Sequence, residues 1–234
     1  MTGAAAVAGL RVLVFDLDET LWPLQPTLDR AEAALHRWLA AHAPRIARHL
    51  GVDALRAHRR RVAAERPALA HDVTALRREH LRRLLAEWGY PPGLAEEALE
   101  AFRAARDRVE PYRDVPAALG ALSVRYRLVA ASNGNARLAR TPLAPYLDAG
   151  FDAAALGAAK PDPRFFREIA RRLGAPPGAL MHVGDDPERD IDAARRAGLR
   201  TAWVNRRGLP WPPALAAPAL VAPDLEALCD RLLA

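Results

Sequence analysis

Four short apolar segments constrain the fold of this chain more than any other feature. They are Arg11 to Phe15, Arg127 to Ala131, Ala179 to Val183 and Thr201 to Val204. Runs of this length and composition are typical of buried parallel strands. Helical periodicity occurs between them, from Pro163 to Leu173 and from Asp190 to Ala197. This alternation of strands and helices predicts a doubly wound α/β sheet. The Pro- and Ala-rich stretch from Leu209 to Pro223 is interpreted as a surface connection.

The stretch from Thr27 to about Glu110 has a different pattern. Apolar residues recur there at helical spacing, and Pro or Gly interrupts the pattern at intervals. Several helices in succession without a convincing strand predict a small all-helical insert. We therefore expect a catalytic core of residues 1–22 and 111–234 and a helical domain of residues 23–110.

Composition sets limits on where the protein works. The one cysteine, Cys229, excludes an intramolecular disulfide and fits a reducing cytoplasm. No run approaches the roughly 20 apolar residues that a membrane span needs. The first ten residues, Met1 to Leu10, lack a basic start, so we do not expect a signal peptide. The expected location is the cytoplasm, with no membrane partner.

The formal net charge of +6 raises the question of a nucleic-acid partner. Acidic residues are interspersed among the arginines, however, and no basic block stands out. The small basic excess of the helical insert either attracts an anionic substrate or forms a solvated helical surface. We expect no nucleic-acid partner.

Polar side chains follow three of the predicted strands. They are Asp16 and Asp18, then Ser132 and Asn133, then Asp185 and Asp186. In an open parallel sheet, ligands bind outside the carboxyl ends of the strands. Lys160 is the single lysine among 34 basic residues and precedes a predicted helix start, from which it can reach the same edge. Its retention suggests a place where a compact ammonium is needed instead of a guanidinium.

Converging carboxylates repel each other and need a cation if they are to stay ionised. A set of oxygen ligands without a His or Cys pair favours Mg²⁺. A hard divalent ion beside Lys160 makes an anion site, and the obvious anion is a phosphoryl group. If the chain changes direction after the first strand, one of Asp16 and Asp18 can attack phosphorus while the other handles the leaving-group proton.

Each motif also has a plainer interpretation. Asp18 to Thr20 fits a helix capping box, and both Ser132 to Gly134 and Gly184 to Pro187 fit turns. Trp22 either meets a substrate ring or packs near the start of the insert. Six of the seven histidines lie in the insert at irregular spacing, which favours scattered histidines over a ligand cluster. The occurrence of all the motifs in this order favours a common site.

These motifs resemble those of the haloacid dehalogenase-like superfamily. Asp16 to Thr20 is similar to the first motif, DxDxT, and Ser132 to the second. Lys160 is similar to the third-motif lysine, and Asp185 to Asp190 to the acidic fourth motif. The resemblance spans about residues 12–204, and it implies a Rossmann-like three-layer core with a helical cap inserted after the first strand.

The resemblance also implies roles. Asp16 would be the nucleophile, Asp18 the acid and base, and Thr20 a residue that orients this region. Ser132, the Asn133 backbone and Lys160 would bind phosphate. Mg²⁺ would be held by Asp16, the Asp18 backbone carbonyl and Asp185. Asp190 would fix Lys160 from behind, and Asp186 would either lie near the metal or serve the structure.

Within the superfamily, the dehalogenases lack the second aspartate, so Asp18 implies phosphate chemistry. Glu19 and Thr20 differ from the glycine and β-branched pair that is common in the mutases. The resemblance therefore implies a monomeric or homodimeric phosphomonoesterase for a small phosphorylated metabolite. Ser132 to Asn135 and His182 to Asp186 are similar to a subgroup that dephosphorylates a riboflavin precursor and flavin mononucleotide (FMN). The first alternative is a phosphotransferase or mutase of the same fold. A less favoured alternative is a non-catalytic nucleic-acid-binding module.

Overall fold

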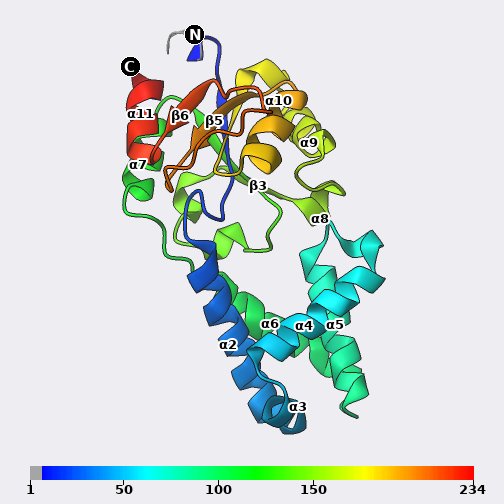
Figure 1. Cartoon of the computed structure of the whole chain (residues 1–234). Helices are drawn as coiled ribbons and strands as arrows, with labels where there is room; N and C mark the ends of the chain where they lie inside the picture. The colour runs from blue at the N-terminus through cyan, green and yellow to red at the C-terminus, as the bar shows by residue number, and fades with distance from the viewer. Residues whose placement is uncertain (1–6) are drawn as a thin grey trace. The chain divides into compact units, whose positions relative to one another are not determined.

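The computed structural model describes residues 7–234, which form two compact units (Figure 1). The first unit comprises the chain up to Pro23 together with Glu110–Asn133 and Pro142–Ala234. The second comprises Leu24–Val109 and Gly134–Thr141. The opening six residues, which belong to the segment considered above as a signal peptide, lie outside the described range.

The first unit is built on a six-stranded sheet with the strand order β3-β2-β1-β4-β5-β6. The strands are β1 (Val12–Phe15), β2 (Arg127–Ser132), β3 (Ala149–Asp152), β4 (Leu180–Gly184), β5 (Arg200–Val204) and β6 (Leu220–Ala222). All neighbouring strands are parallel. The predicted doubly wound α/β sheet is therefore confirmed, and β1, the strand that precedes Asp16, lies between β2 and β4.

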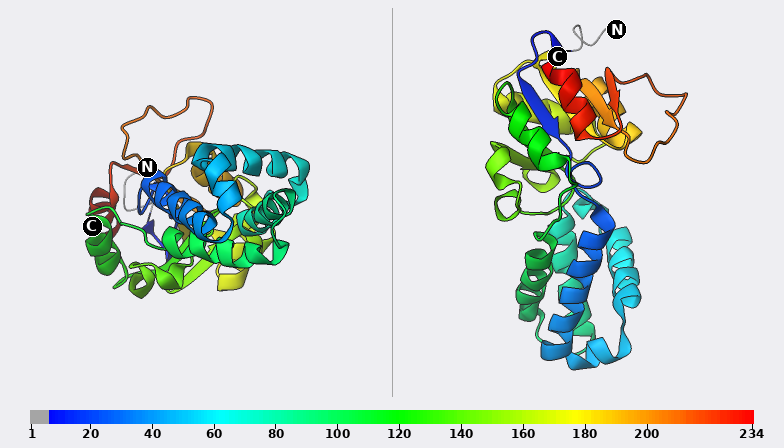
Figure 2. Two further views of the ribbon diagram at one scale, coloured as in Figure 1. Left: turned by 90° about the horizontal axis from the view of Figure 1, so that it is seen from below. Right: turned by 90° about the vertical axis from the view of Figure 1, so that its left-hand side faces the viewer.

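Helices cover both faces of this sheet. They are α7 (Val115–Leu122), α8 (Ala153–Leu156), α9 (Pro163–Leu173), α10 (Ala193–Arg196) and α11 (Leu225–Leu233), with short 3₁₀ turns η4 (Ala144–Tyr146) and η5 (Pro177–Ala179). In Figures 1 and 2, α7 and α11 lie together on one face, and α9 and α10 lie on the other. One buried apolar cluster joins α9 and α10 to β1, β2 and β4. The unit is thus a three-layer Rossmann-like fold, as the resemblance implied.

Local signals explain where α9 begins and ends. The Asp162 side chain accepts a hydrogen bond from the Arg164 N–H, and Pro163 occupies the first helical position, where its missing N–H costs nothing. Gly174, with a positive φ of 62°, terminates the helix. These signals are visible in the sequence, and the predicted helix matches the observed one.

Two predictions about this unit were wrong in detail. The helix expected to begin at Asp190 begins instead as a π-helical turn, η6 (Pro187–Asp192), and becomes α-helical only in α10. The helical segment starts three residues earlier than expected because the Asp186 side chain caps it. The Pro- and Ala-rich stretch from Leu209 to Pro223, interpreted as a surface connection, contains β6. That short strand pairs with β5 and extends the sheet by one strand, although its sequence carries no clear strand pattern.

The second unit is helical throughout its described residues. Its helices are α2 (Leu24–His42), α3 (Pro44–His49), α4 (Val52–Glu65), α5 (Val73–Glu87) and α6 (Ala95–Arg106), with 3₁₀ turns η1 (Pro67–Leu69), η2 (Pro92–Leu94) and η3 (Leu138–Arg140). They enclose an apolar core of their own, made mainly of Leu and Ala side chains. The unit is therefore a small all-helical domain, as the insert predicted.

A segment from beyond the insert completes this helical unit. Residues Gly134–Thr141 directly follow the second polar cluster of the sequence, and they pack with the helices. The anchor is Arg137, whose backbone N–H and Nε both donate to the Asp107 carboxylate, at 2.8 and 2.6 Å. Arg137 also donates to Glu100 on α6 at 2.7 Å.

Two of the histidines of the helical unit lie in contact. The rings of His58 and His80 are 5.0 Å apart, and both side chains are buried. Burial is the main reason that the pKa of His80 is lowered to about 3, and the charges of His58, Arg77 and Arg59 add to the effect. His80 is therefore neutral in the folded protein under conditions in which an unfolded histidine takes up a proton.

This difference predicts a pH-dependent stability. Below the unfolded pKa of 6.5, the unfolded chain binds a proton at His80 that the folded chain does not, so stability falls as the pH falls toward 3. Between pH 7.5 and pH 5 the wild type should lose about 2 kcal/mol of unfolding free energy more than a His80→Leu variant. Urea unfolding of both proteins at the two pH values measures this. Equal pH dependence in the two proteins would show that His80 is not responsible.

No helix of residues 7–234 combines the length and the apolar character that crossing a membrane requires.

Candidate active site

Asp16 lies immediately after β1, at the carboxyl edge of the sheet. Its backbone N–H donates to the Val183 carbonyl on β4 at 2.8 Å, so the neighbouring strand continues to hold the chain at this point. The Asp16 side chain is buried, with a relative exposure of 7%. A carboxylate in such a place is fixed in position and partly shielded from water.

The chain reverses direction directly after Asp16. The Glu19 N–H donates to the Trp22 carbonyl at 2.8 Å, and Asp18 and Trp22 form an isolated bridge. Glu19 occupies the left-handed region with a φ of 63°, an uncommon conformation for a residue other than Gly. The negative charge of Asp18 is among the influences that raise the pKa of Asp16, after burial and the neighbouring charge of Asp190. The next helix begins only at Leu24, so the residues from Asp18 do not cap it.

The Asp18 side chain is held by Trp22. The indole N–H of Trp22 donates to Asp18 Oδ1 at 2.8 Å, and the ring is fully buried. Trp22 therefore packs inside the protein and orients a carboxylate. This relation was not foreseen from the sequence, although the four-residue spacing of the two side chains across a turn was a usable signal.

Lys160 lies between two carboxylates. Its Nζ is 2.5 Å from Asp16 Oδ1 and 2.6 Å from Asp190 Oδ1, and the side chain is buried. Burial opposes the charge on Lys160, but the two carboxylates outweigh it and raise the pKa of the ammonium group. The lysine is therefore a fixed positive charge directed at Asp16.

The second pair of polar residues, Ser132 and Asn133, contacts the backbone of Lys160. Ser132 is the buried last residue of β2. The side-chain amide of the next residue, Asn133, pairs with Lys160 in both directions. Asn133 Nδ2 donates to the Lys160 carbonyl at 2.8 Å, and Asn133 Oδ1 accepts from the Lys160 N–H at 2.9 Å. Asn133 thus fixes the main chain from which the lysine side chain extends.

The side chains of the acidic fourth motif, Asp185 to Asp190, bind different partners. Asp185 Oδ1 accepts a long hydrogen bond of 3.4 Å from Thr20 Oγ1, and the Asp185 carbonyl accepts from the Trp203 indole at 2.8 Å. Asp186 accepts from two backbone N–H groups at the start of η6. Both of those bonds go to Asp186 Oδ1 and cap the start of the turn. Asp190 binds Lys160, as described above.

Arg206 braces the turn that follows Asp16, and sequence reasoning missed it. Its Nε donates to the Thr20 carbonyl at 3.2 Å, and its guanidinium binds Asp114 in a bidentate manner at 3.1 and 2.9 Å. The same group stacks on the Tyr112 ring at 4.0 Å. In a chain this rich in arginine, no pattern in the sequence distinguishes Arg206 from the others.

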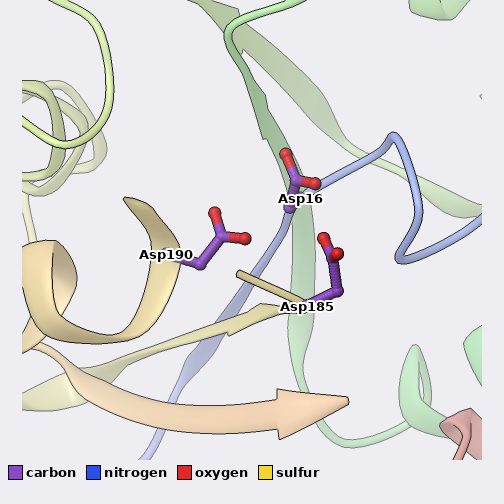
Figure 3. A group of neighbouring side chains, drawn as sticks. All are labelled: Asp16, Asp185 and Asp190. Atoms are coloured by element: carbon purple, nitrogen blue, oxygen red, sulfur yellow. The ribbon is translucent and has the colours of Figure 1, made fainter. Parts of the chain in front are cut away.

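Three carboxylates face one another at the centre of this arrangement (Figure 3). Within residues 7–234, Asp16, Asp185 and Asp190 form the one group of three or more acidic, His or Cys side chains with ligand atoms all within 4.8 Å of one another. Burial is the largest cause of a pKa of about 7 for Asp185 and also raises that of Asp16, with neighbouring carboxylates adding to both shifts. One ammonium group does not balance three carboxylates, so these residues fit a divalent cation.

Comparison with known proteins identifies the family of this chain. Residues 10–198 match the family model described as haloacid dehalogenase-like hydrolase. The chain is 29% identical over 203 residues to the 5-amino-6-(5-phospho-D-ribitylamino)uracil phosphatase YigB of Escherichia coli, with 84% of each protein covered. It is 34% identical over 165 residues to the phosphoserine phosphatase of Thermus thermophilus, covering 68% of this chain and 66% of that one.

Solved structures give the same classification. A 2-haloacid dehalogenase from Pseudomonas syringae pv. Tomato DC3000 superposes with a TM-score of 0.88 at 37% identity, covering 96% of this chain and 98% of the other. The chain therefore belongs to the haloacid dehalogenase-like hydrolase family, and the resemblance drawn from its motifs is confirmed. The family includes both phosphatases and dehalogenases among these relatives.

Proposed function

We propose that the protein is a Mg²⁺-dependent phosphomonoesterase that hydrolyses a small phosphorylated metabolite through an aspartyl-phosphate intermediate on Asp16. The observation that carries this proposal is the meeting of Asp16, Asp185 and Lys160 at the carboxyl edge of the sheet. A buried carboxylate, a place for a hard cation and a fixed ammonium group are the parts that phosphoryl transfer needs.

The two aspartates of the turn divide the chemistry. A carboxylate oxygen of Asp16 forms a bond to phosphorus while the bond from phosphorus to the ester oxygen breaks, and the departing oxygen takes a proton from Asp18. Asp18 then accepts a proton from the water that attacks the aspartyl-phosphate, which releases inorganic phosphate and restores Asp16. The hydrogen bond from Trp22 fixes the carboxylate that moves these protons.

The metal ligands would be the Asp16 carboxylate, the Asp18 backbone carbonyl and Asp185. Asp190 is left out because its Oδ1 accepts from Lys160 and its Oδ2 from the Asp186 N–H. When bound, Mg²⁺ would neutralise charge on the phosphoryl oxygens. Thr20, which donates to Asp185, would orient one of the ligands.

The phosphate group would be bound by Ser132, the Asn133 backbone N–H and Lys160. The helical unit would act as the cap that excludes bulk water and contacts the rest of the substrate. We further propose that the protein works in the cytoplasm as a monomer or homodimer, without a nucleic-acid partner.

The substrate proposal follows the similarity to YigB, which extends over 84% of both chains. Ribitylamino-uracil phosphate and FMN, a related flavin phosphate, are therefore the first compounds to test. A screen of phosphorylated metabolites that includes both would identify the substrate. Release of inorganic phosphate distinguishes a hydrolase from a phosphotransferase or mutase, which would give a phosphorylated acceptor instead.

Dehalogenation is the alternative raised by the structural relative from Pseudomonas syringae. Asp18 favours phosphate chemistry, because a displacement at carbon leaves a halide that needs no proton, whereas an alkoxide leaving group does. Assays for halide release from 2-chloropropionate should therefore be negative with a preparation that hydrolyses para-nitrophenyl phosphate.

Metal removal tests the metal part of the proposal. Treatment with EDTA should lower para-nitrophenyl phosphate hydrolysis by about 100-fold or more, since a cation at a phosphoryl group contributes several kcal/mol of charge stabilisation. Adding Mg²⁺ in excess of the chelator should restore the rate, and a buffer exchange without chelator serves as the control. Full activity in EDTA would contradict a metal-dependent mechanism.

A further inference from the structure

His182 is a buried polar residue to which the proposed mechanism assigns no task. It lies in the middle of β4, paired with Val14 of β1 and Thr201 of β5, and has no exposed surface. Its ring meets Phe166 of α9 edge to face, with the centroids 4.6 Å apart. Burying a polar ring in an apolar layer costs free energy unless the ring is hydrogen-bonded, so the position of its partner carries information.

That partner is Asp190. His182 Nε2 is 3.0 Å from Asp190 Oδ1, the same oxygen that accepts from Lys160 Nζ at 2.6 Å. Burial lowers the pKa of His182 despite the neighbouring carboxylate, which favours a neutral ring. Since a carboxylate only accepts hydrogen bonds, the neutral ring donates through Nε2–H. Nucleophile, lysine, Asp190 and His182 thus form one continuous buried chain.

The absence of a side chain at Gly184 leaves space for the Asp190 side chain. A Cβ added at that position would lie 2.5 Å from both the Cβ and the Oδ2 of Asp190, closer than real side chains approach. The other Asp190 oxygen, Oδ2, accepts from the Asp186 N–H at 3.1 Å. The close approach of Gly184 and the bond from the Asp186 N–H therefore place Asp190 against β4 and the turn that follows it, and His182 adds a side-chain donor from the same strand.

We propose that His182 is a positioning residue for the reaction. By donating to Asp190 it fixes the carboxylate that holds Lys160 on Asp16, without touching substrate itself. A lysine side chain is long and flexible, so a partner with a fixed orientation keeps the ammonium group in one place. The inference rests on the proposed function of Asp16 and Lys160.

The test separates a hydrogen-bonding role from simple filling of space. His182→Phe keeps a ring of similar size and removes the donor, whereas His182→Gln keeps an N–H donor at about the position of Nε2. With para-nitrophenyl phosphate and saturating Mg²⁺, we expect kcat of the Phe variant to fall about 10- to 100-fold, as is typical when a supporting partner of an active-site group is lost. KM should change less than kcat, and the Gln variant should recover most of the rate.

Thr201→Val is the matched control, because it alters a buried polar side chain of similar depth on the neighbouring strand. It should leave kcat nearly unchanged. A Phe variant as active as the wild type would overturn the inference, as would a Gln variant that is no better than the Phe variant.

If His182→Phe does not fold, as judged by circular dichroism, His182→Asn replaces it, because the shorter amide does not reach Asp190. Equal rates of the Asn and Gln variants would then overturn the inference, and a more active Gln variant would support it. Failure of the proposed function is a different result, because the wild type itself would then release no phosphate.

Discussion

Replacing Asp16 with asparagine is expected to abolish phosphate release from para-nitrophenyl phosphate in the presence of Mg²⁺. A carboxamide is a far weaker nucleophile than a carboxylate and cannot form the aspartyl-phosphate, so the rate should fall by about 10⁴-fold or more. Asparagine matches aspartate in size, and the backbone bond from residue 16 to Val183 does not involve the side chain. The loss should therefore reflect chemistry and not unfolding.

Stability of the Asp16→Asn variant supports this interpretation. The substitution removes one of three carboxylates that lie within 4.8 Å of one another, so thermal unfolding should occur at the same temperature as in the wild type or higher. Asp192→Asn is a suitable control. Asp192 lies at the end of η6 and binds Arg195 and Arg196 at the surface. Substantial residual activity of Asp16→Asn, together with normal activity of the control, would show that another group attacks phosphorus.

Much of the fold follows from patterns along the chain. The strands β1, β2 and β4 are apolar runs in the sequence, and parallel strands bring their carboxyl ends to one edge of a sheet. This topology predicts that the aspartates and the serine lie at one edge of the sheet, whereas Lys160 precedes α9 and is only predicted to be able to reach that edge. The strand β6 escaped prediction because its pairing with β5, and not its own sequence, makes it a strand.

The supporting contacts of the site could not be predicted in the same way. The bonds from Trp22 to Asp18, from Asn133 to Lys160 and from Trp203 to Asp185 depend on side-chain rotamers and turn geometry. A residue pattern does not report these. The packing of residues 134–141 with the helical unit has a similar origin, because it depends on ion pairs of Arg137 with residues far away in the sequence.

The histidines of the helical unit illustrate a related limit. Their irregular spacing predicted scattered residues, and three of the six, His36, His42 and His49, lie within hydrogen-bond distance of a backbone carbonyl. His58 and His80 are nevertheless in contact. They come from α4 and α5, so the contact is a product of helix packing that periodicity within either helix does not specify.

Lys160→Arg is expected to inactivate the enzyme almost as completely as loss of the charge. The ammonium group is buried with Nζ at 2.5 and 2.6 Å from two carboxylates. A planar guanidinium is larger and presents its donors in a fixed fork, so it would have to displace Asp16 or Asp190. We expect kcat to fall by about 100- to 1000-fold, within the range found when a group that stabilises transition-state charge is lost.

Two further variants make this result interpretable. Lys160→Met removes the charge at similar length and should also be nearly inactive, so activity in the Arg variant but not in the Met variant would show that charge alone is needed. The reverse exchange, Arg164→Lys, serves as the control. Arg164 lies on the exposed surface of α9 in an ion pair with Asp162. It should leave both activity and stability almost unchanged, because exposed ion pairs contribute about 1 kcal/mol or less. A fully active Lys160→Arg enzyme would mean that the single lysine of an arginine-rich chain is retained for a reason other than its shape.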